Sequence, residues 1–357
     1  MQDAVRTTTS PLSHHNHIGT LKPINGETLA SVEDLAYQAG LDYTVSNEMP
    51  YRCIPDISAD GQMRGTFLPM TDRKGDVPGY WPHAIFRDGS VVAMHKSVGK
   101  NYTGDGELEK LLSLAWALQQ AGMATVEYAG AIKDWSAAII QMRLPQETLI
   151  RGDRYVNNLQ IGTSFVGEEA FYVTMSARRF WCSNERPTIN KSKVVKRQHR
   201  RLEGQWTVDS IAREIAMLTP QHEQYFEALD RMAETTVDST IKALFVNRMF
   251  GPEPLITDPR FRNIDGTVNE TKYQSAWTRR NNNVFSWNSA YESPANSAVW
   301  NTVAGLYEAT LQDLQYARDG KGHSKQGGLA AITGKPSFVT RERKAFDLAN
   351  RFTHAGV

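Results

Sequence analysis

The chain has 357 residues, of which 40% are hydrophobic and 22% are charged, so it can bury a core and is not disordered as a whole. Lys and Arg total 40 against 39 Asp and Glu, which excludes a globally basic protein and restricts any nucleic-acid surface to a local patch. Two cysteines, Cys53 and Cys182, exclude a disulfide scaffold and an all-cysteine zinc site. No apolar run approaches the roughly 20 residues that a membrane span needs.

The first residues predict a flexible arm. Residues 1–26 are rich in Ser, Thr, Pro and Asn, and residues 1–10 lack the apolar core of a signal peptide. This N-terminal arm holds three histidines: His14, His15 and His17. They have no cysteine or carboxylate neighbour that would favour a metal site, so we expect a solvated tail.

Helix and turn signals follow the arm. Ser31 and Asp34 form a capping box at the start of the first expected helix. An Asp-Gly turn at residues 88–89 predicts a hairpin over residues 83–96. Leucines at helical spacing predict a second helix at residues 107–121.

The middle of the chain changes to a strand pattern. Apolar, β-branched and aromatic residues alternate or run together, and turn residues separate the segments. The expected strands lie at residues 125–128, 132–144, 155–165 and 170–182. Because short turns join consecutive segments, we predict an antiparallel meander.

Helical spacing then returns. Helices are expected at residues 207–218, from Thr219-Pro220 to about 235, and at 238–250. Residues 251–294 hold four prolines and a polar run, and predict a long loop or linker. Beyond it, a long helix is expected at residues 295–317, a lysine-bearing loop at 320–328 and a short basic helix at 340–352.

These elements predict an α+β protein with an antiparallel or mixed sheet, packed helices and a helical C-terminal region. The expected division of the chain is an arm at residues 1–26, a core domain at 27–250, a linker at 251–294 and a C-terminal helix with a basic tail at 295–357.

Common enzyme signatures are missing from the sequence. It contains no H-E-x-x-H, C-x-x-C or G-x-S-x-G motif. Gly334-Lys335 resembles the end of a phosphate-binding loop, but Pro336 stands where Ser or Thr would bind magnesium. We therefore expect a protein that is not an enzyme and needs no metal or cofactor.

The strongest feature of the sequence is a run of positive charge. Residues 178–201 carry nine basic side chains and one acid, Glu185, so this segment is +8 in a chain of +1. The basic residues are Arg178, Arg179, Arg186, Lys191, Lys193, Lys196, Arg197, Arg200 and Arg201. Aromatic residues accompany them, and Phe180, Trp181 and Trp206 are the candidates for stacking on bases. Cations with stackable rings are typical of single-stranded nucleic-acid sites.

The same charge has a simpler interpretation. A basic run can be a solvated face that is paired with acids elsewhere in the fold, and Phe180 and Trp181 can belong to the core. Basic residues near the C-terminus add a second, smaller group: Lys321, Lys325, Lys335, Arg341, Arg343 and Lys344. Either reading fits that group too.

Several motifs in this order resemble the phage/plasmid-like protein family, a domain of unknown function found on phages, prophages and conjugative plasmids. They lie at residues 39–45 (AGLDYTV), 97–102 (SVGKNY), 178–185 (RRFWCSNE) and 300–302 (WNT), and the resemblance spans about residues 25–320. The family pattern Arg-Val-Val-Cys-x-Asn-Thr keeps its Arg, Cys182 and Asn184 here, whereas Phe180-Trp181 replace the apolar pair.

The resemblance implies a role on mobile DNA in the cytoplasm of a bacterial host. The meander, followed by a helix and with basic residues at the junction, is also similar in architecture to ring-forming single-strand annealing proteins. We therefore predict a single-stranded DNA binding and annealing protein. It is expected to act as a homo-oligomer, in a ring or filament, and not to bind a membrane. The alternatives are an anti-defence factor that binds a host protein and a self-assembling structural phage protein.

Overall fold

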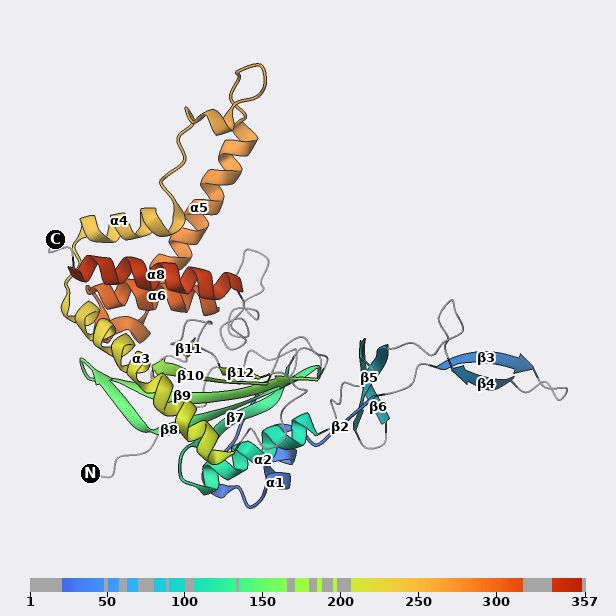
Figure 1. Cartoon of the computed structure of the whole chain (residues 1–357). Coiled ribbons are helices and arrows are strands. Elements are labelled where there is room, and N and C mark those ends of the chain that lie inside the picture. Colours follow the sequence, from blue (N-terminus) through green and yellow to red (C-terminus); the bar gives the residue numbers. More distant parts are fainter. Residues whose placement is uncertain are drawn as a thin grey trace. The chain divides into compact units, whose positions relative to one another are not determined.

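The computed structural model describes residues 21–47, 51–57, 63–69, 80–87, 90–99, 106–132, 135–165, 171–179, 185–187, 195–197, 207–316 and 336–354 (Figure 1). The chain forms two compact units, and each is assembled from three stretches of sequence. Unit 1 comprises Met1–Pro145, Asn158–Met175 and Ser192–Met217. Unit 2 comprises Gln146–Asn157, Ser176–Lys191 and Leu218–Val357.

The main sheet has the strand order β1-β7-β8-β9-β10-β11, and β12 also pairs with β10. Its strands are β1 (Lys22–Pro23), β7 (Thr125–Ile132), β8 (Ala137–Ile150), β9 (Asp153–Ser164), β10 (Phe171–Arg179), β11 (Glu185–Pro187) and β12 (Val195–Arg197). Neighbours from β7 to β10 are consecutive in sequence, so the predicted meander and the α+β class are confirmed. Arg151 and Gly152, both at positive φ, make the tight turn from β8 to β9.

Two smaller groups of strands also belong to unit 1. β2 (Thr44–Asn47), β5 (Tyr80–Arg87) and β6 (Ser90–Gly99) form a three-stranded sheet, and β3 (Tyr51–Ile57) pairs with β4 (Met63–Pro69). The register of β5 and β6 places Arg87 opposite Ser90. The hairpin predicted around the Asp-Gly turn is therefore confirmed.

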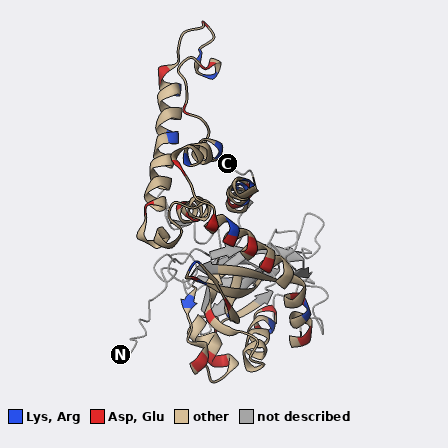
Figure 2. Ribbon diagram, turned by 90° about the vertical axis from the view of Figure 1, so that its left-hand side faces the viewer, with Lys and Arg blue, Asp and Glu red and all other residues tan. Residues whose placement is uncertain are grey.

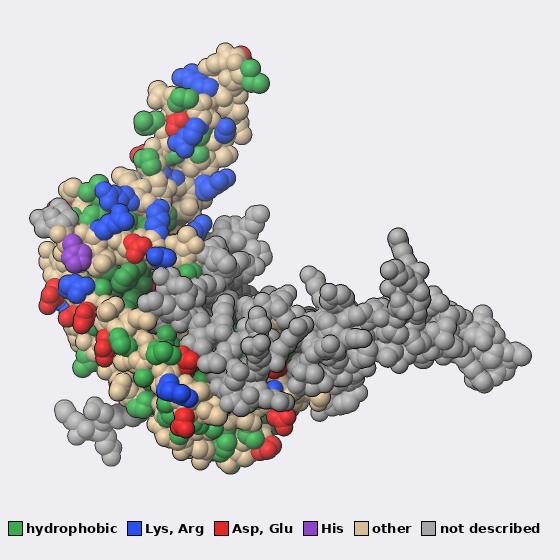
Figure 3. Space-filling view, viewed as in Figure 1, with side chains coloured by type: hydrophobic (Ala, Val, Ile, Leu, Met, Phe, Trp, Pro, Cys, Tyr) green, Lys and Arg blue, Asp and Glu red, His purple; other side chains and the backbone are tan. Residues whose placement is uncertain are grey.

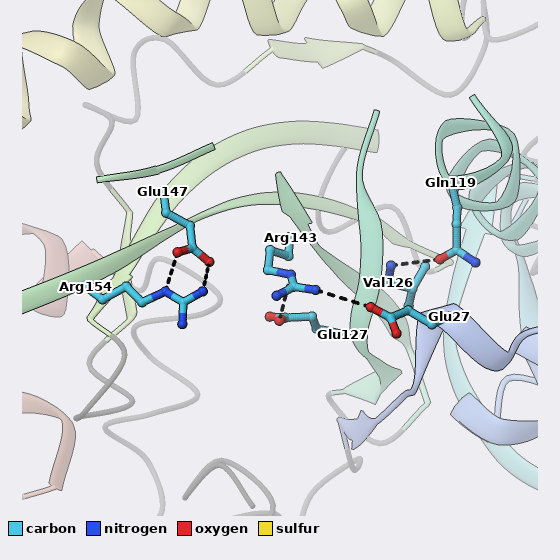
Figure 4. A network of polar contacts seen from close by, with 7 residues as sticks. All are labelled: Glu27, Gln119, Val126, Glu127, Arg143, Glu147 and Arg154. Atoms are coloured by element: carbon cyan, nitrogen blue, oxygen red, sulfur yellow. Dashed lines mark hydrogen bonds and ion pairs between the residues drawn. The ribbon is translucent and has the colours of Figure 1, made fainter. Parts of the chain in front are cut away.

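Two predicted helices of unit 1 are confirmed as α1 (Val32–Ala39) and α2 (Glu107–Gln120), and both contact β7. The hydroxyl of Ser31 accepts the backbone N–H of Asp34, as the capping box requires, and Gly40 ends α1 in the left-handed region with φ 67°. The side chain of Gln119 donates to the carbonyl of Gly26 at 2.8 Å and accepts the N–H of Val126 at 2.9 Å (Figure 4). It thereby fixes the end of α2 to the edge of the sheet.

Residues 21–26 differ from the predicted flexible arm. Lys22 and Pro23 form β1, paired with β7, and a short 3-10 helix, η2 (Gly26–Thr28), follows. Leu21 and Ile24 are both buried. The burial of these two apolar side chains holds the segment against the sheet, a contribution that composition alone does not reveal. Residues 1–20 of the predicted N-terminal arm lie outside the described residues.

Ion pairs fasten strands within each unit. In unit 1, Arg143 on β8 lies 3.5 Å from the carboxylate of Glu127 on β7 and 3.9 Å from that of Glu27 in η2 (Figure 4). In unit 2, the guanidinium of Arg154 donates two hydrogen bonds to Glu147 across the β8–β9 hairpin. This two-point contact raises the pKa of Arg154.

A single long helix, α3 (Val208–Glu234), replaces the two helices predicted on either side of Thr219-Pro220. Proline in a helix interior removes a hydrogen bond and crowds the preceding turn. Leu218, Tyr225 and Leu229 are nevertheless buried at helical spacing through this region. Burial of that apolar face outweighs the local defect at Pro220.

The remaining helices build unit 2. They are α4 (Ser239–Phe250), η5 (Pro259–Phe261), α5 (Glu270–Tyr291), η6 (Pro294–Val299), α6 (Val303–Tyr316) and α8 (Pro336–His354). Asp238 caps α4 by accepting the N–H of Ile241 at 2.8 Å, and α4 and α8 confirm the helices predicted there. Trp287 is fully buried in the core, stacks on Tyr291 and donates its indole N–H to Thr310 at 2.9 Å.

The last long helix starts later than predicted. Ser293 and Pro294 begin η6 instead, and Asn301 takes a left-handed conformation with φ 57° before α6 begins. Trp300 lies outside α6 and is 54% exposed. The left-handed residue interrupts the backbone hydrogen-bond ladder, so the two segments cannot form one helix.

The segment predicted as a linker contains a 22-residue helix, α5. We call residues 251–286 the arm, because Phe261 is the only buried residue in this fully described stretch, and Figure 1 shows it extending away from α6 and α8. Asn269 caps α5 by accepting the N–H of Lys272. Its far end is held by Trp287, Ala290 and Tyr291 in the core of unit 2. The division of the chain at residues 27, 251 and 295 stays a prediction.

Candidate nucleic-acid interface

Part of the predicted basic segment lies on strands. Within unit 2, the pairing of β10 with β11 places Arg178 opposite Glu185, the only acid of the segment. Within unit 1, the pairing of β10 with β12 places Lys196 opposite Tyr172 and Arg197 opposite Phe171. The backbone thus fixes these cations in pleated structure, in two different units.

The other predicted site residues lie outside the described part of the chain. They are Phe180, Trp181, Lys191, Lys193, Arg200, Arg201 and Trp206, and Arg179 is described only as the last residue of β10. Lys321, Lys325 and Lys335 of the C-terminal group also lie outside it. The described residues therefore do not bring the predicted site together.

The described side chains instead form a basic pocket between α4 and α8, which we call the α4–α8 pocket. It has a volume of about 500 Å³. It is lined by Arg248 of α4 and by Val339, Thr340, Arg343, Lys344, Asp347, Leu348 and Arg351 of α8. Four cations against one carboxylate give this wall a net charge of +3, which would attract an anion.

The helical repeat of α8 creates this wall. Phe338, Ala345 and Phe352 are buried in the core of unit 2. Residues three and four apart share a helix face, so Lys344, Asp347 and Arg351 follow one another along the opposite side. The buried stripe fixes the helix, and the polar stripe faces the pocket.

Two contacts position the cations without removing their charge. The ammonium of Lys344 donates to the carbonyl of Met249 at 3.2 Å, near the C-terminal end of α4 where carbonyls lack helical partners. The guanidinium of Arg343 lies 3.8 Å from the carboxylate of Asp347, and both side chains are more than half exposed. An exposed pair of this kind is weak.

Basic residues continue from the pocket along the arm. Arg280 donates to the carbonyl of Gly251 and to the side chain of Asn247, each at 2.9 Å, and thereby joins α5 to the end of α4. Figures 2 and 3 show Lys and Arg recurring along this part of unit 2. The arm carries Arg260, Arg262, Lys272, Arg279 and Arg280, against Glu253, Asp258, Asp265 and Glu270.

The described residues also show neither a metal-binding cluster nor a membrane-spanning helix. Within the described ranges, no group of three His, Cys, Asp or Glu side chains could hold a metal ion. The helices found in the same ranges include none long and apolar enough to cross a bilayer.

The basic group that the sequence predicts near the C-terminus includes Arg343 and Lys344 of the pocket, but neither Arg248 nor Arg351. The cations three and four residues apart in the last helix were the available signal.

The comparisons with known proteins identify a family. Residues 94–330 match the family model of a domain of unknown function, DUF932. No curated protein and no solved structure matches the chain. The match begins later than the resemblance expected from about residue 25, and it ends before α8. It covers about two thirds of the chain, so the chain belongs to the DUF932 family.

Proposed function

We propose that this protein binds single-stranded DNA and anneals complementary strands as a homo-oligomer encoded by a phage or plasmid and acting in the bacterial cytoplasm. The observation that carries the proposal is the α4–α8 pocket, where four cations surround one accessible concave surface. Phosphate groups are the anions that several convergent Arg and Lys side chains recognise best.

The basic segment at residues 178–201 supports the proposal independently. Its charge of +8 far exceeds what the chain as a whole carries. In the strand register Arg178 is opposite Glu185, whereas Lys196 and Arg197 are opposite Tyr172 and Phe171. Neutralising both backbones while leaving base edges free would allow complementary strands to pair, without a cofactor or a catalytic step.

A binding titration tests the pocket. The fluorescence anisotropy of labelled single- and double-stranded oligonucleotides is measured with the wild type and with Arg343→Gln/Arg351→Gln. The matched control is Arg213→Gln/Arg231→Gln, which removes two exposed cations from α3. We expect the pocket variant to weaken single-strand binding by about tenfold or more, because each lost phosphate contact also loses counterion release. The control should bind like the wild type.

The salt dependence gives a second readout. If about six cations contact phosphates, the log–log slope of affinity against salt is roughly −4, and the pocket variant should reduce its magnitude by roughly 1.4. Changing Lys196, Arg197, Arg200 and Arg201 to Glu should abolish binding and the annealing of two dye-labelled strands. No oligonucleotide affinity at low salt, or equal losses in the pocket and control variants, would contradict the proposal.

The alternative is a host protein that docks on the same basic surface. The exposed apolar residues of the arm favour some protein contact. A stoichiometric protein that co-purifies with the chain, together with no affinity for oligonucleotides, would support this alternative.

A further inference from the structure

The outer end of the arm is a dense, hydrogen-bonded loop that presents one apolar side chain to solvent. We call residues 258–269 the tip. Asn263 accepts the N–H of Gly266 in a tight turn, and the N–H of Asn269 donates to the carbonyl of Phe261 at 2.7 Å. Ile264, inside that turn, has a relative exposure of 110%.

Side chains reinforce the tip. Asp265 accepts hydrogen bonds from the hydroxyl and the N–H of Thr267, at 2.6 and 3.0 Å, and these contacts lower the pKa of its carboxyl. The ring of Phe261 is buried against Tyr273, with the centroids 5.6 Å apart. A loop held in one conformation loses little entropy when it docks, so it is suited to insertion into a partner.

Exposed apolar side chains are frequent along the arm. The arm contributes half of the large exposed hydrophobic residues in the described part of the chain: Leu255, Ile256, Ile264, Trp277 and Phe285.

Unit 1 contains a pocket with the complementary character, which we call the α2 pocket. It has a volume of about 450 Å³ and lies between the segment 41–45 and the first turns of α2. Leu41, Leu108 and Leu112 provide apolar walls, and the exposed residues Thr44 and Glu109 line it as well. It would accept an apolar group that is flanked by a cation.

The tip supplies the matching cation. Arg260 is paired with Asp258 at 2.6 Å. Arg262 donates to the carbonyl of Gly266 at 3.1 Å, and it forms no ion pair within the described residues. Arg262 and Ile264 are two residues apart in the same loop. The tip therefore combines one fully exposed aliphatic group with one cation, as the α2 pocket combines an aliphatic wall with Glu109.

We propose that the tip of one copy of this chain docks into the α2 pocket of a second copy, with Ile264 among Leu41, Leu108 and Leu112 and with Arg262 facing Glu109. Tip and pocket are different surfaces, so the interface is heterologous and can repeat from copy to copy. Such an interface closes into a ring or grows into a filament. The inference does not depend on DNA binding.

Sedimentation velocity of the full chain without DNA tests the interface. The tip is blocked by Ile264→Asp, and the pocket is blocked by Thr44→Arg/Glu109→Arg, which changes only exposed positions. Leu255→Asp is the matched control, because it places the same charge on the same arm away from the tip. We expect the wild type and the control to assemble alike, and each blocked variant to lose association by about tenfold or more.

Mixing the two blocked variants separates this interface from other modes of assembly. The intact tip of the pocket variant can still enter the intact pocket of the tip variant, so an equimolar mixture should form heterodimers that grow no further. A wild type that stays monomeric at high concentration overturns the proposal. So does assembly of Ile264→Asp at wild-type strength, or a mixture that contains no heterodimer. Circular dichroism of each variant confirms that it is folded.

Discussion

The imidazole of His222 couples the stability of unit 2 to pH. His222 is 4% exposed, its Nε2 lies 2.7 Å from Oδ1 of Asn157, and its ring meets the edge of Phe226 with the centroids 4.8 Å apart. The neutral ring donates from Nε2 to the amide oxygen. Burial lowers the pKa of His222 to about 4, from an ordinary value near 6.5.

The sign of the pH effect follows from this shift. Between pH 6.5 and 4 the unfolded chain binds a proton at His222 that the folded chain rejects, so stability falls as the pH falls through that window. The difference between pH 7 and pH 4 amounts to about 3 kcal/mol for this group. Urea unfolding at several pH values should show the decline, and His222→Gln, which keeps a donor for Asn157, should flatten it.

Carboxylates with shifted pKa values also make stability depend on pH. Asp258 is an example, because hydrogen bonds from Arg260 lower the pKa of its carboxyl. The substitution at His222 leaves such groups unchanged, so we expect them to contribute equally in the wild type and the variant. The difference between the two chains therefore isolates the histidine. An equal pH slope in both would show that His222 is not the group responsible.

The 3-10 helix η6 and the helix α6 of unit 2 lie very close together at Gly305. A Cβ built on this residue would lie 2.4 Å from the carbonyl oxygen of Val299 in η6. Thr302 joins the same contact, because its hydroxyl donates to Val299 O at 2.6 Å and accepts the N–H of Gly305 at 3.2 Å. Glycine here allows the 3-10 helix to pack directly on α6.

Gly305→Ala is therefore expected to destabilise the protein by about 1–3 kcal/mol, because the methyl group would force the two elements apart. Helix propensity predicts the opposite sign, since alanine stabilises a helix interior by roughly 1 kcal/mol relative to glycine. The change in the urea midpoint decides between these effects. A more stable variant would contradict the close packing of η6 on α6.

Local signals predicted those elements that carry their own caps and a strong apolar period. Ser31 with Asp34 and the cap at Asp238 define helix starts through contacts three residues away, which a sequence displays directly. α5 was missed because most of its length is exposed and shows no apolar face. It is held by its cap at Asn269 and by Trp287 and Tyr291 at its far end.

The interface was only partly predictable for a similar reason. Charge counting finds cations that are neighbours in sequence, such as those of residues 178–201. The α4–α8 pocket joins Arg248 to Arg351 through the packing of two helices, and no local pattern reports that juxtaposition. Resemblance to a family did not help either, since the matched region ends before α8.

At the scale of the whole molecule, the two units share elements. The strands β8, β9 and β10 and the helix α3 each contribute residues to both units. Unfolding either unit alone would break hydrogen-bonded elements of the other. We therefore expect a single cooperative transition in urea, with tryptophan fluorescence and far-UV circular dichroism changing together. Two separated transitions would show that the units are independent.

This interleaving also governs how the chain can fold on the ribosome. Tyr155 donates to Glu308 at 3.1 Å within unit 2, across 153 residues of sequence. At roughly 5–20 residues per second, the hydroxyl of Tyr155 waits roughly 8–30 s for its partner to be translated. Throughout that interval the strand residues around it await the helices that will bury them, so nascent chains of intermediate length are the forms most exposed to chaperones and proteases.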